Sequence, residues 1–294
     1  MFNIKEFATH DEYVAYTADT GDFITPNVSY CRKKRECHFT SKQPQHDFTK
    51  DYLTFYAIES GTFKFSGNSI DYSLDSGQTW TTLASNTYSP TVNAGGAIMW
   101  RMSGKTPTSN KGIGRFYSSN KYKAQGNIMS IVNGDNFEGT SSISNYQFYG
   151  LFVSSVGLVS AKNLYLPPTT IPTSGYSNMF DGCTSLTEAP KLIATTLGNS
   201  CYCYMFNLCY SLTTAPELPA TTLVSGCYNY MFRGCSKLNY IKALFTTTPS
   251  TSYTNTWVNG VSSTGTFVKN SAAQWDVTGI NGVPTGWTIQ TASN

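Results

Sequence analysis

Charged residues are scarce in this chain. Asp, Glu, Lys and Arg make up 13% of its 294 residues, and the formal net charge is only +3. Nucleic-acid-binding domains usually gather Lys and Arg on one face at high pI, so we expect no nucleic-acid partner. Phe, Trp and Tyr together reach 14%. Many aromatic and few charged residues are typical of a β-rich extracellular or particle-exposed protein, because rigid rings provide contact area at low entropic cost.

Long apolar runs are also missing. The nearest candidate for a membrane span, residues 148–161, is interrupted by three serines and is shorter than the roughly 18 residues that a span needs. The first residues include Glu6, Asp11 and Glu12 and lack the apolar core of a secretory signal. We therefore expect no membrane partner and no secretory signal in this sequence.

The chain holds few residues of the kinds that carry out catalysis. All three histidines lie in the first 50 residues, away from the cysteine-rich region, and no His–Cys zinc spacing is present. A glycosidase needs two carboxylates that flank one glycosidic bond. Spacing favours no such pair among the four acidic residues after position 160, which are Asp181, Glu188, Glu217 and Asp276. We therefore expect no enzymatic activity, no metal and no cofactor.

A basic segment covers residues 101–123, which include six Lys or Arg residues and no acidic residue. Such a segment can meet an acidic glycan or the carboxylates of a partner protein. An ordinary solvated loop is the simpler interpretation.

The eight cysteines form an even set, but cysteine is also a common small buried residue in a chain of this length. Cys31 and Cys37 flank a basic tip, and the sequence leaves open whether they form a disulfide. The other six lie between positions 183 and 235. Repeat-related cysteines stack about 5 Å apart in a strand-like solenoid, so a cysteine metal cluster is conceivable, although buried free thiols are the simpler interpretation.

Charge density divides the chain, with 14 charged residues in positions 1–50 and 10 in positions 161–294. We place boundaries near residues 48 and 125. Residues 1–48 are expected to form a small mixed module. Thr9 and Glu12 make a capping-box pattern for a short helix, and residues 26–39 resemble a hairpin with a basic tip.

Residues 49–125 alternate apolar and polar side chains, as in Leu53, Phe55 and Ala57, which predicts an antiparallel β-sandwich. Residues 73–80 match the Asp-box pattern SxDxGxTW. In such a hairpin the Asp side chain stabilises its own turn and the Trp packs beneath it. Asp boxes occur in sialidases and in many unrelated β proteins, and a single copy favours the structural interpretation.

A repeat of 26 residues is the strongest feature of the sequence. Four residue types recur at this spacing: Tyr176, Tyr202 and Tyr228; Met179, Met205 and Met231; Cys183, Cys209 and Cys235; Leu186, Leu212 and Leu238. Such self-similarity indicates a solenoid, in which stacked repeats bury a continuous core. We expect the solenoid over residues 126–245. A C-terminal cap is expected over residues 246–294, anchored by Trp257, Phe267, Trp275 and Trp287.

Each repeat has two parts. The first places Tyr, Met or Phe, and Cys at helical spacing, which predicts one or two helical turns. The second part, Leu-Thr-x-Ala-Pro-x-Leu, predicts an extended segment. Pro190 and Pro216 lack the amide donor of a central strand, so we expect strands of about two to four residues that end near them. The expected fold is therefore mostly β with short helices: a small N-terminal module, an antiparallel β-sandwich, and a short solenoid with a C-terminal cap.

The repeat contains a block of eight residues, Met179-Phe180-Asp181-Gly182-Cys183-Thr184-Ser185-Leu186, that returns at 231–238. Together with the Ala-Pro-x-Leu segment, this block resembles BspA-like leucine-rich-repeat proteins, which are abundant in gut Bacteroidales and in phages that infect them. The tail, at 265–270 and 282–287, is similar to the endings of those proteins. The opening resembles openings of structural proteins from such phages, of the crAss-like type. The resemblance implies adhesion or particle decoration.

From this resemblance we expect a structural protein of the phage virion, of head-fibre, decoration or tail-fibre type, because secreted family members carry an export signal that this sequence lacks. The partners would be a capsid or tail protein and a host-surface glycan or protein. The candidate attachment residues for the particle are Tyr13, Val28, Tyr30, Arg32, Lys33, Lys34 and Arg35, and the candidate ligand face is Thr187, Thr213 and Asn239. Fibre proteins of this kind resemble homo-oligomers, with a trimer favoured. The alternative is a bacterial BspA-like cell-surface adhesin or glycan-binding protein.

Overall fold

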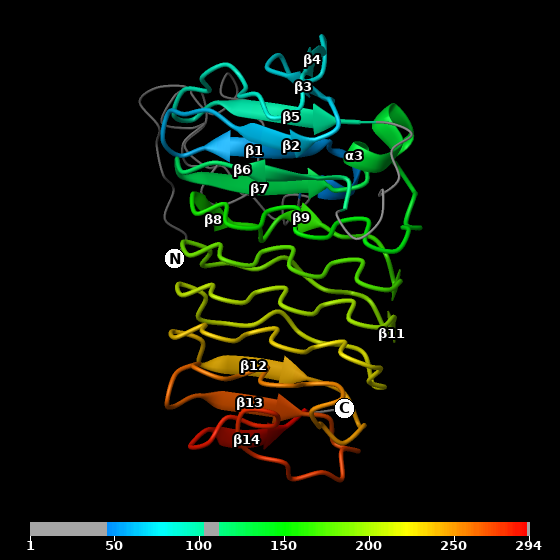
Figure 1. The fold of residues 1–294 in the computed structure, drawn as a ribbon, viewed down its shortest axis with the longest axis vertical. Helices are drawn as coiled ribbons and strands as arrows, with labels where there is room; N and C mark the ends of the chain where they lie inside the picture. Colours follow the sequence, from blue (N-terminus) through cyan, green and yellow to red (C-terminus); the bar gives the residue numbers. More distant parts are fainter. Residues whose placement is uncertain (1–45, 103–111, 293–294) are drawn as a thin grey trace, which may run out of the picture. The chain divides into compact units, whose positions relative to one another are not determined.

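The computed structural model describes residues 46–102 and 112–292. The chain divides into two compact units, Met1–Asp47 and Phe48–Asn294, and all the described helices and strands belong to the second unit (Figure 1). The helix and the hairpin expected within residues 1–48, including Cys31 and Cys37, lie outside the described residues.

An antiparallel sheet begins the second unit, after the short 3-10 helix η1 (Phe48–Lys50). Its strands are β1 (Leu53–Ala57), β3 (Ile70–Ser73), β4 (Thr81–Leu83), β5 (Ala97–Arg101) and β7 (Tyr122–Asn127), in the spatial order β4-β3-β5-β1-β7. A separate antiparallel pair joins β2 (Lys64–Gly67) to β6 (Gly114–Tyr117). The predicted alternation is clear in β5, where Ile98 and Trp100 are buried and the other three residues are half-buried.

The two sheets pack against each other through an aromatic core. The ring centroid of Phe55, in β1, lies 4.8 Å from that of Phe116, in β6, 5.3 Å from that of Phe63 and 5.6 Å from that of Trp100. All four rings are buried. Tilted and edge-on rings at these separations lie in the favourable range for aromatic pairs. The two layers are unequal, because the second is only two strands wide.

Strand β7 joins this sheet to the repeats. It pairs antiparallel with β1, and it pairs parallel with β8 (Leu158–Ser160) and β9 (Leu164–Tyr165). The boundary that we placed near residue 125 falls inside this shared strand. One hydrophobic core continues from Leu53 to Trp287. The antiparallel sheet therefore covers the first coil of the solenoid, whose core would otherwise be exposed.

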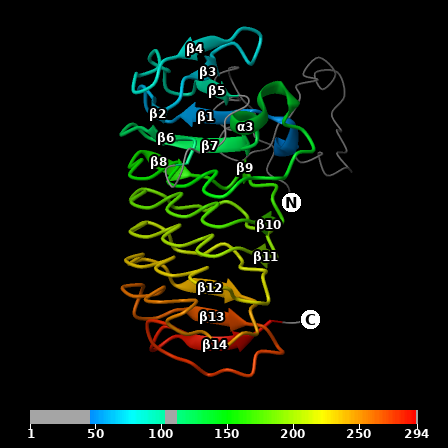
Figure 2. The same cartoon turned by 45° about the vertical axis from the view of Figure 1, so that its right-hand side comes forward.

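The repeats form a β-solenoid of about five turns. Strand β10 (Thr170–Ile171) pairs with β11 (Thr196–Leu197), and β12 (Tyr240–Ala243), β13 (Thr266–Lys269) and β14 (Thr288–Thr291) form a parallel three-stranded sheet. Figures 1 and 2 show the coils stacked in sequence order. The described part of the chain contains one α-helix, α3 (Ser130–Asn133), followed by the 3-10 helix η3 (Gly134–Asn136). The prediction of a mostly β chain with a repeat solenoid is confirmed.

The prediction of helical turns in each repeat is wrong. Residues 174–183 form consecutive β-turns, in which the backbone amides alternate between two kinds of partner. The Met179 amide donates to the Tyr176 carbonyl within the turn, at 3.2 Å, whereas the Phe180 amide donates to Met205 of the next coil, at 2.9 Å. Every fourth residue is left-handed, with φ of 58° at Asn178 and 71° at Gly182.

Helical spacing and this chain of turns place buried side chains at the same intervals, which explains the error. A helix uses its interior amides for its own i−4 carbonyls, so it has none to spare for the neighbouring repeat. In the chain of turns, every second amide has no acceptor within its own coil and donates to a carbonyl of the next coil, which connects the coils.

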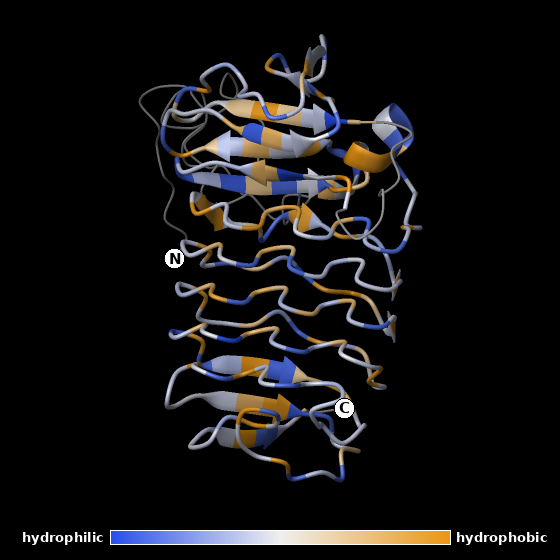
Figure 3. Ribbon diagram, viewed as in Figure 1, coloured by the Kyte–Doolittle hydropathy of each residue, from blue (hydrophilic) through white to orange (hydrophobic). Residues whose placement is uncertain are grey.

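The interior of the solenoid consists of stacked identical side chains. The rings of Phe152, Phe180, Phe206 and Phe232 stack with centroid separations of 5.4, 5.4 and 5.7 Å and interplanar angles of 3–5°. Beside them, the thiol of Cys209 donates to the Phe180 carbonyl at 3.2 Å. Figure 3 shows apolar positions recurring from coil to coil. The 26-residue period is therefore the period of one complete coil.

The C-terminal tail extends the solenoid, because β13 and β14 both lie within it. The four aromatic anchors expected there, Trp257, Phe267, Trp275 and Trp287, are all buried. Among the described residues, no helix is long and apolar enough to cross a membrane.

Candidate functional site

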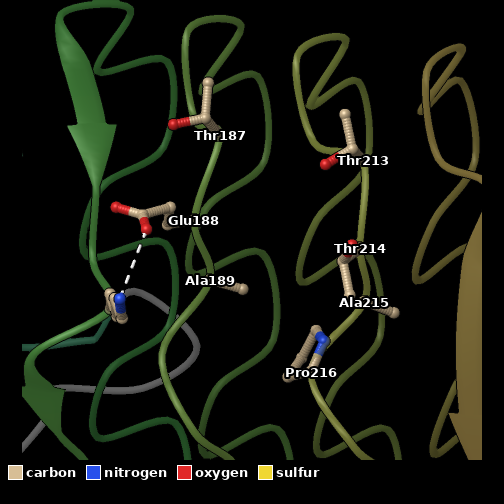
Figure 4. Close-up of a pocket in the computed structure, with 8 residues that line it drawn as sticks. Thr187, Glu188, Ala189, Thr213, Thr214, Ala215 and Pro216 are labelled. Carbon is tan, nitrogen blue, oxygen red and sulfur yellow. Dashed lines mark ion pairs between the residues drawn. The ribbon is translucent and has the colours of Figure 1, made fainter. Parts of the chain in front are cut away.

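The candidate ligand face follows the extended segments of successive coils. Thr187, Thr213 and Asn239 are exposed and occupy equivalent positions, 26 residues apart. The Thr187 amide donates to the Val159 carbonyl at 2.8 Å, and the Asn239 amide donates to the Thr213 carbonyl at 2.9 Å. Backbone bonds to neighbouring coils therefore hold the residues of this row. Figure 4 shows Thr187 and Thr213 side by side on adjacent coils.

An open depression of about 360 Å³ lies between the coils that carry Thr187 and Thr213 (Figure 4). Its lining is formed by Lys162, Thr187, Glu188, Ala189, Thr213, Thr214, Ala215 and Pro216. Asn239 belongs to the same row of residues but is not part of this lining. The lining therefore combines three threonines, one ion pair and three small apolar residues.

The depression coincides with a gap in the parallel backbone ladder. On the coils before and after it, the Ala161 amide donates to Glu188 and the Ala215 amide donates to Tyr240, both at 2.9 Å. Among the described residues, no backbone hydrogen bond joins 187–189 to 213–215. The amides of Ala189 and Thr213 consequently have no hydrogen-bond partner in the part of the chain that the structure describes.

Both coils beside this gap carry a proline. Pro190 and Pro216 follow the extended segments directly and have no amide hydrogen to donate. Isolated bridges at Glu188 and Thr214 replace the short strands that we expected before the prolines. Peptide groups that the protein leaves unpaired need water or a ligand as a hydrogen-bond partner. The open ladder therefore provides backbone donors and acceptors beside the threonine hydroxyls.

The charges in the depression balance each other. The Lys162 ammonium lies 3.7 Å from a Glu188 carboxylate oxygen, and both side chains are about half exposed or more, at 68% and 48%. Ser160 donates a hydrogen bond of 2.7 Å to the other oxygen of Glu188. An exposed pair of this kind contributes only about 0–1 kcal/mol. The lining has one carboxylate, which is too few for a two-carboxylate glycosidase mechanism.

The cysteines of the repeats are free thiols, and all but the half-buried Cys203 are buried. Burial raises the pKa of Cys203 and of Cys227 to about 11 and that of Cys235 to about 12. The thiolate is the form that attacks electrophiles and binds metals, so burial disfavours the reactive form of these thiols at neutral pH. The described residues contain no group of three His, Cys, Asp or Glu side chains that could hold a metal ion.

The Asp box is a structural turn, as the sequence predicted. Asp75 accepts hydrogen bonds from the Thr79 hydroxyl at 2.6 Å and from the Thr79 amide at 2.9 Å, and the Ser73 hydroxyl lies 2.7 Å away. These bonds, those from Thr79 first, lower the pKa of Asp75 to about 2. The indole of Trp80 donates to the Gly77 carbonyl at 3.1 Å. Each polar group of the motif thus serves the turn itself.

The basic segment contributes in part to the fold. Arg101 lies 2.7 Å from Asp135 and 3.5 Å from Asp71, and its guanidinium stacks 4.3 Å from the Trp80 ring centroid. Arg115, in β6, is exposed. Lys105 and Lys111 lie outside the described residues.

The candidate attachment residues, all between Tyr13 and Arg35, also lie outside the described residues. Sequence reasoning proposed Thr187 and Thr213 for the ligand face but missed Lys162, Glu188 and the open ladder. The sequence feature that could have indicated the open ladder is the Ala-Pro dipeptide, which occurs at 189–190 and again at 215–216. Its proline lacks an amide donor in each of two adjacent coils.

Comparisons with protein-family models, curated proteins and solved structures found no match for this chain.

Proposed function

We propose that this chain is a non-enzymatic structural protein of a phage virion, of head-fibre, decoration or tail-fibre type, that presents its solenoid to glycans on the host surface. The Met-Phe-x-Gly-Cys block, which resembles BspA-like leucine-rich repeats, supports this assignment. Residues 1–48 would attach the protein to a capsid or tail protein. The finer description of the solenoid as a leucine-rich repeat is part of the same proposal.

The open ladder between Thr187 and Thr213 is the observation that carries the binding function. A neutral sugar offers hydroxyl groups that both donate and accept, and the depression offers the same two capacities through backbone groups and the hydroxyls of Thr213 and Thr214. The Thr187 hydroxyl can only accept, because it donates to the Val159 carbonyl at 3.0 Å. Its ion pair carries no net charge. The hydrogen-bonded coils hold these groups at fixed positions, so little conformational entropy is lost when a ligand binds.

A shallow site of this size binds weakly by itself. We propose that a homo-oligomer, with a trimer favoured, presents several copies at once. Linked sites raise the overall avidity by about 10²–10⁴ when all of them engage one surface.

The binding proposal is tested with the double variant Thr187→Val and Thr213→Val, which removes two hydroxyls and keeps the side-chain shape. Because the Thr187 hydroxyl also donates to the Val159 carbonyl of the preceding coil, thermal unfolding shows whether the variant remains folded. We expect loss of most binding to neutral glycans on an array of host-surface saccharides. Thr222→Val is the matched control, because Thr222 is exposed in the same solenoid but away from the depression. Equal glycan binding by the double variant and the control would refute the assigned site.

The location is tested by following the protein through a density gradient of the source culture with mass spectrometry. Co-sedimentation with virus particles is the expected result, and deletion of residues 1–47 should abolish it, because Met1–Asp47 is a unit of its own. Sedimentation with cell envelopes would instead support the bacterial surface adhesin. Normal particle incorporation after the deletion would rule out the attachment role.

A further inference from the structure

A second polar surface lies on the turn side of the coils, at Tyr204, Tyr230 and Arg233. The two tyrosine rings stack with centroids 4.4 Å apart and an interplanar angle of 10°. All three side chains are half-buried. The Arg233 guanidinium carbon lies 5.4 Å from each ring centroid. Because the two distances are equal, the guanidinium lies beside the stack, within reach of both rings, and does not cap one end of it.

A chain of amide hydrogen bonds fixes this guanidinium. The Arg233 Nε donates to the Asn207 Oδ1 at 2.9 Å, and the Asn207 Nδ2 donates to Asp181 at 2.7 Å. The second oxygen of Asp181 accepts from Asn178 at 3.1 Å. Asp181 is thus engaged by two amides and reaches Arg233 only through Asn207. The terminal nitrogens of Arg233 have no hydrogen-bond partner within the described residues.

Arg233 is one of two cations in the stretch 218–275 that have no ion-pair partner among the described residues. Positions 218–275 include four cations and no Asp or Glu: the cations are Arg233, Lys237, Lys242 and Lys269. Lys242 pairs with Glu217 at 2.9 Å, and Lys269 pairs with Asp276 at 3.1 Å. In the part of the chain that the structure describes, Arg233 and Lys237 have no carboxylate partner. Lys237 is exposed, whereas Arg233 is half-buried and held in place.

The hydroxyl groups at this surface complement the cation. The Tyr230 hydroxyl accepts a hydrogen bond of 2.9 Å from Asn255, so its own hydrogen remains available. The Tyr204 hydroxyl lies on the adjacent coil and makes no hydrogen bond with the described residues. Two phenol groups and a planar guanidinium with free donors therefore lie together. An arginine fork matches the two oxygens of a carboxylate.

We propose that Tyr204, Tyr230 and Arg233 form a binding site for the carboxylate of an acidic saccharide, such as a uronic or sialic acid residue. The carboxylate accepts from the terminal nitrogens of Arg233, and the sugar hydroxyls exchange hydrogen bonds with the two phenols. This site lies on the turn side and is separate from the neutral depression at Thr187 and Thr213. The two proposed sites take ligands of different charge, one acidic and one neutral. A negative result in the test of one site therefore leaves the proposal for the other unaffected.

The test measures binding of the full chain to a set of uronic-acid and sialic-acid oligosaccharides, each paired with its carboxyl-reduced counterpart. We expect at least one acidic member to bind about tenfold or more tightly than its reduced form, and Arg233→Gln to remove that difference. Arg233→Lys should restore only part of it, because an ammonium cannot form the fork. Arg115→Gln is the matched control and should bind like the unmodified chain.

Two further measurements keep the result interpretable. Thermal unfolding of each variant shows whether the solenoid remains folded, and Tyr204→Phe, which keeps the ring stack, should weaken binding about threefold to tenfold through the lost hydroxyl. No preference for any acidic saccharide over its reduced form would overturn the proposal. Equal binding by folded Arg233→Gln would do so too, as would a polyglutamate peptide that binds as tightly as the best saccharide.

Discussion

Replacement of Gly182 by Ala tests whether the repeats are built from left-handed turns. The φ of Gly182 is 71°, and a Cβ added there would meet nothing closer than the Ser154 hydroxyl oxygen at 3.4 Å. The substitution therefore changes backbone strain without a steric clash. In a helix, Gly→Ala would stabilise the protein by about 0.8–1.0 kcal/mol. In the observed turn the sign is opposite.

The magnitude follows from two terms. An L-residue in the left-handed region costs about 1–2 kcal/mol, and the reduced freedom of the unfolded chain returns about 0.4–1 kcal/mol. We expect a net loss of about 1 kcal/mol. For a unit of this size, that corresponds to a fall in Tm of about 2–4 °C.

The assay is thermal and urea unfolding of the Gly182→Ala variant beside Gly139→Ala. Gly139 has a φ of 70°, has no atom within 4 Å of an added Cβ, and lies in a turn after η3, before the chain of β-turns begins, so it reports the cost of strain alone. Similar losses in both variants would support the turn geometry. An increase in stability for Gly182→Ala would refute it and restore the helical interpretation.

Three other predictions concern the core, the Asp box and the thiols. Phe206→Ala removes a fully buried ring stacked between Phe180 and Phe232, and urea unfolding should show a loss of about 3–5 kcal/mol; Tyr210→Ala, at a side chain that is 44% exposed, should change little. The pKa of Asp75 is lowered to about 2, so the stability that it adds to its hairpin is present at neutral pH and is lost as pH falls from the ordinary Asp range towards 2. Hydrogen exchange at the Thr79 amide should accelerate in Asp75→Ala, with exchange in the solenoid unchanged. Burial raises the pKa of Cys203 from 9.0 to about 11, so its contribution to stability is full below pH 9 and is lost as pH rises through 11. Iodoacetamide should label Cys203 slowly at pH 8 and faster towards pH 11; rapid labelling of the native protein at pH 7 would contradict this prediction.

The proposed glycan site and the proposed carboxylate site differ in how far the sequence could predict them. Thr187 and Thr213 could be proposed from the sequence because polar residues recur there at the repeat spacing. Arg233 was not, because it occurs once: its equivalents are Asp181 and Asn207. Residues that recur at the repeat spacing stand out in the sequence. The role of a charged residue that occurs once depends on its neighbours on adjacent coils, and the sequence does not show which residues those are.

The sequence by itself determined the period, the stacked core and the β character of the chain. Identical side chains at 26-residue spacing must lie above one another when each repeat forms one coil, so Phe180, Phe206 and Phe232 could be placed in one stack without coordinates. The turn formed by the Asp box could also be predicted from the sequence, because all its hydrogen bonds join residues within seven positions of one another.

Only the tertiary structure decided which backbone conformation the repeats adopt and how the antiparallel sheet connects to the solenoid. Buried residues at intervals of three and four fit a helix and a chain of β-turns equally well. The choice depends on amides that bond to the next coil, as that of Phe180 does to Met205. The same holds for β7, which pairs with β1 on one side and with β8 and β9 on the other. Such bonds connect residues more than 20 positions apart, and no local pattern in the sequence records them.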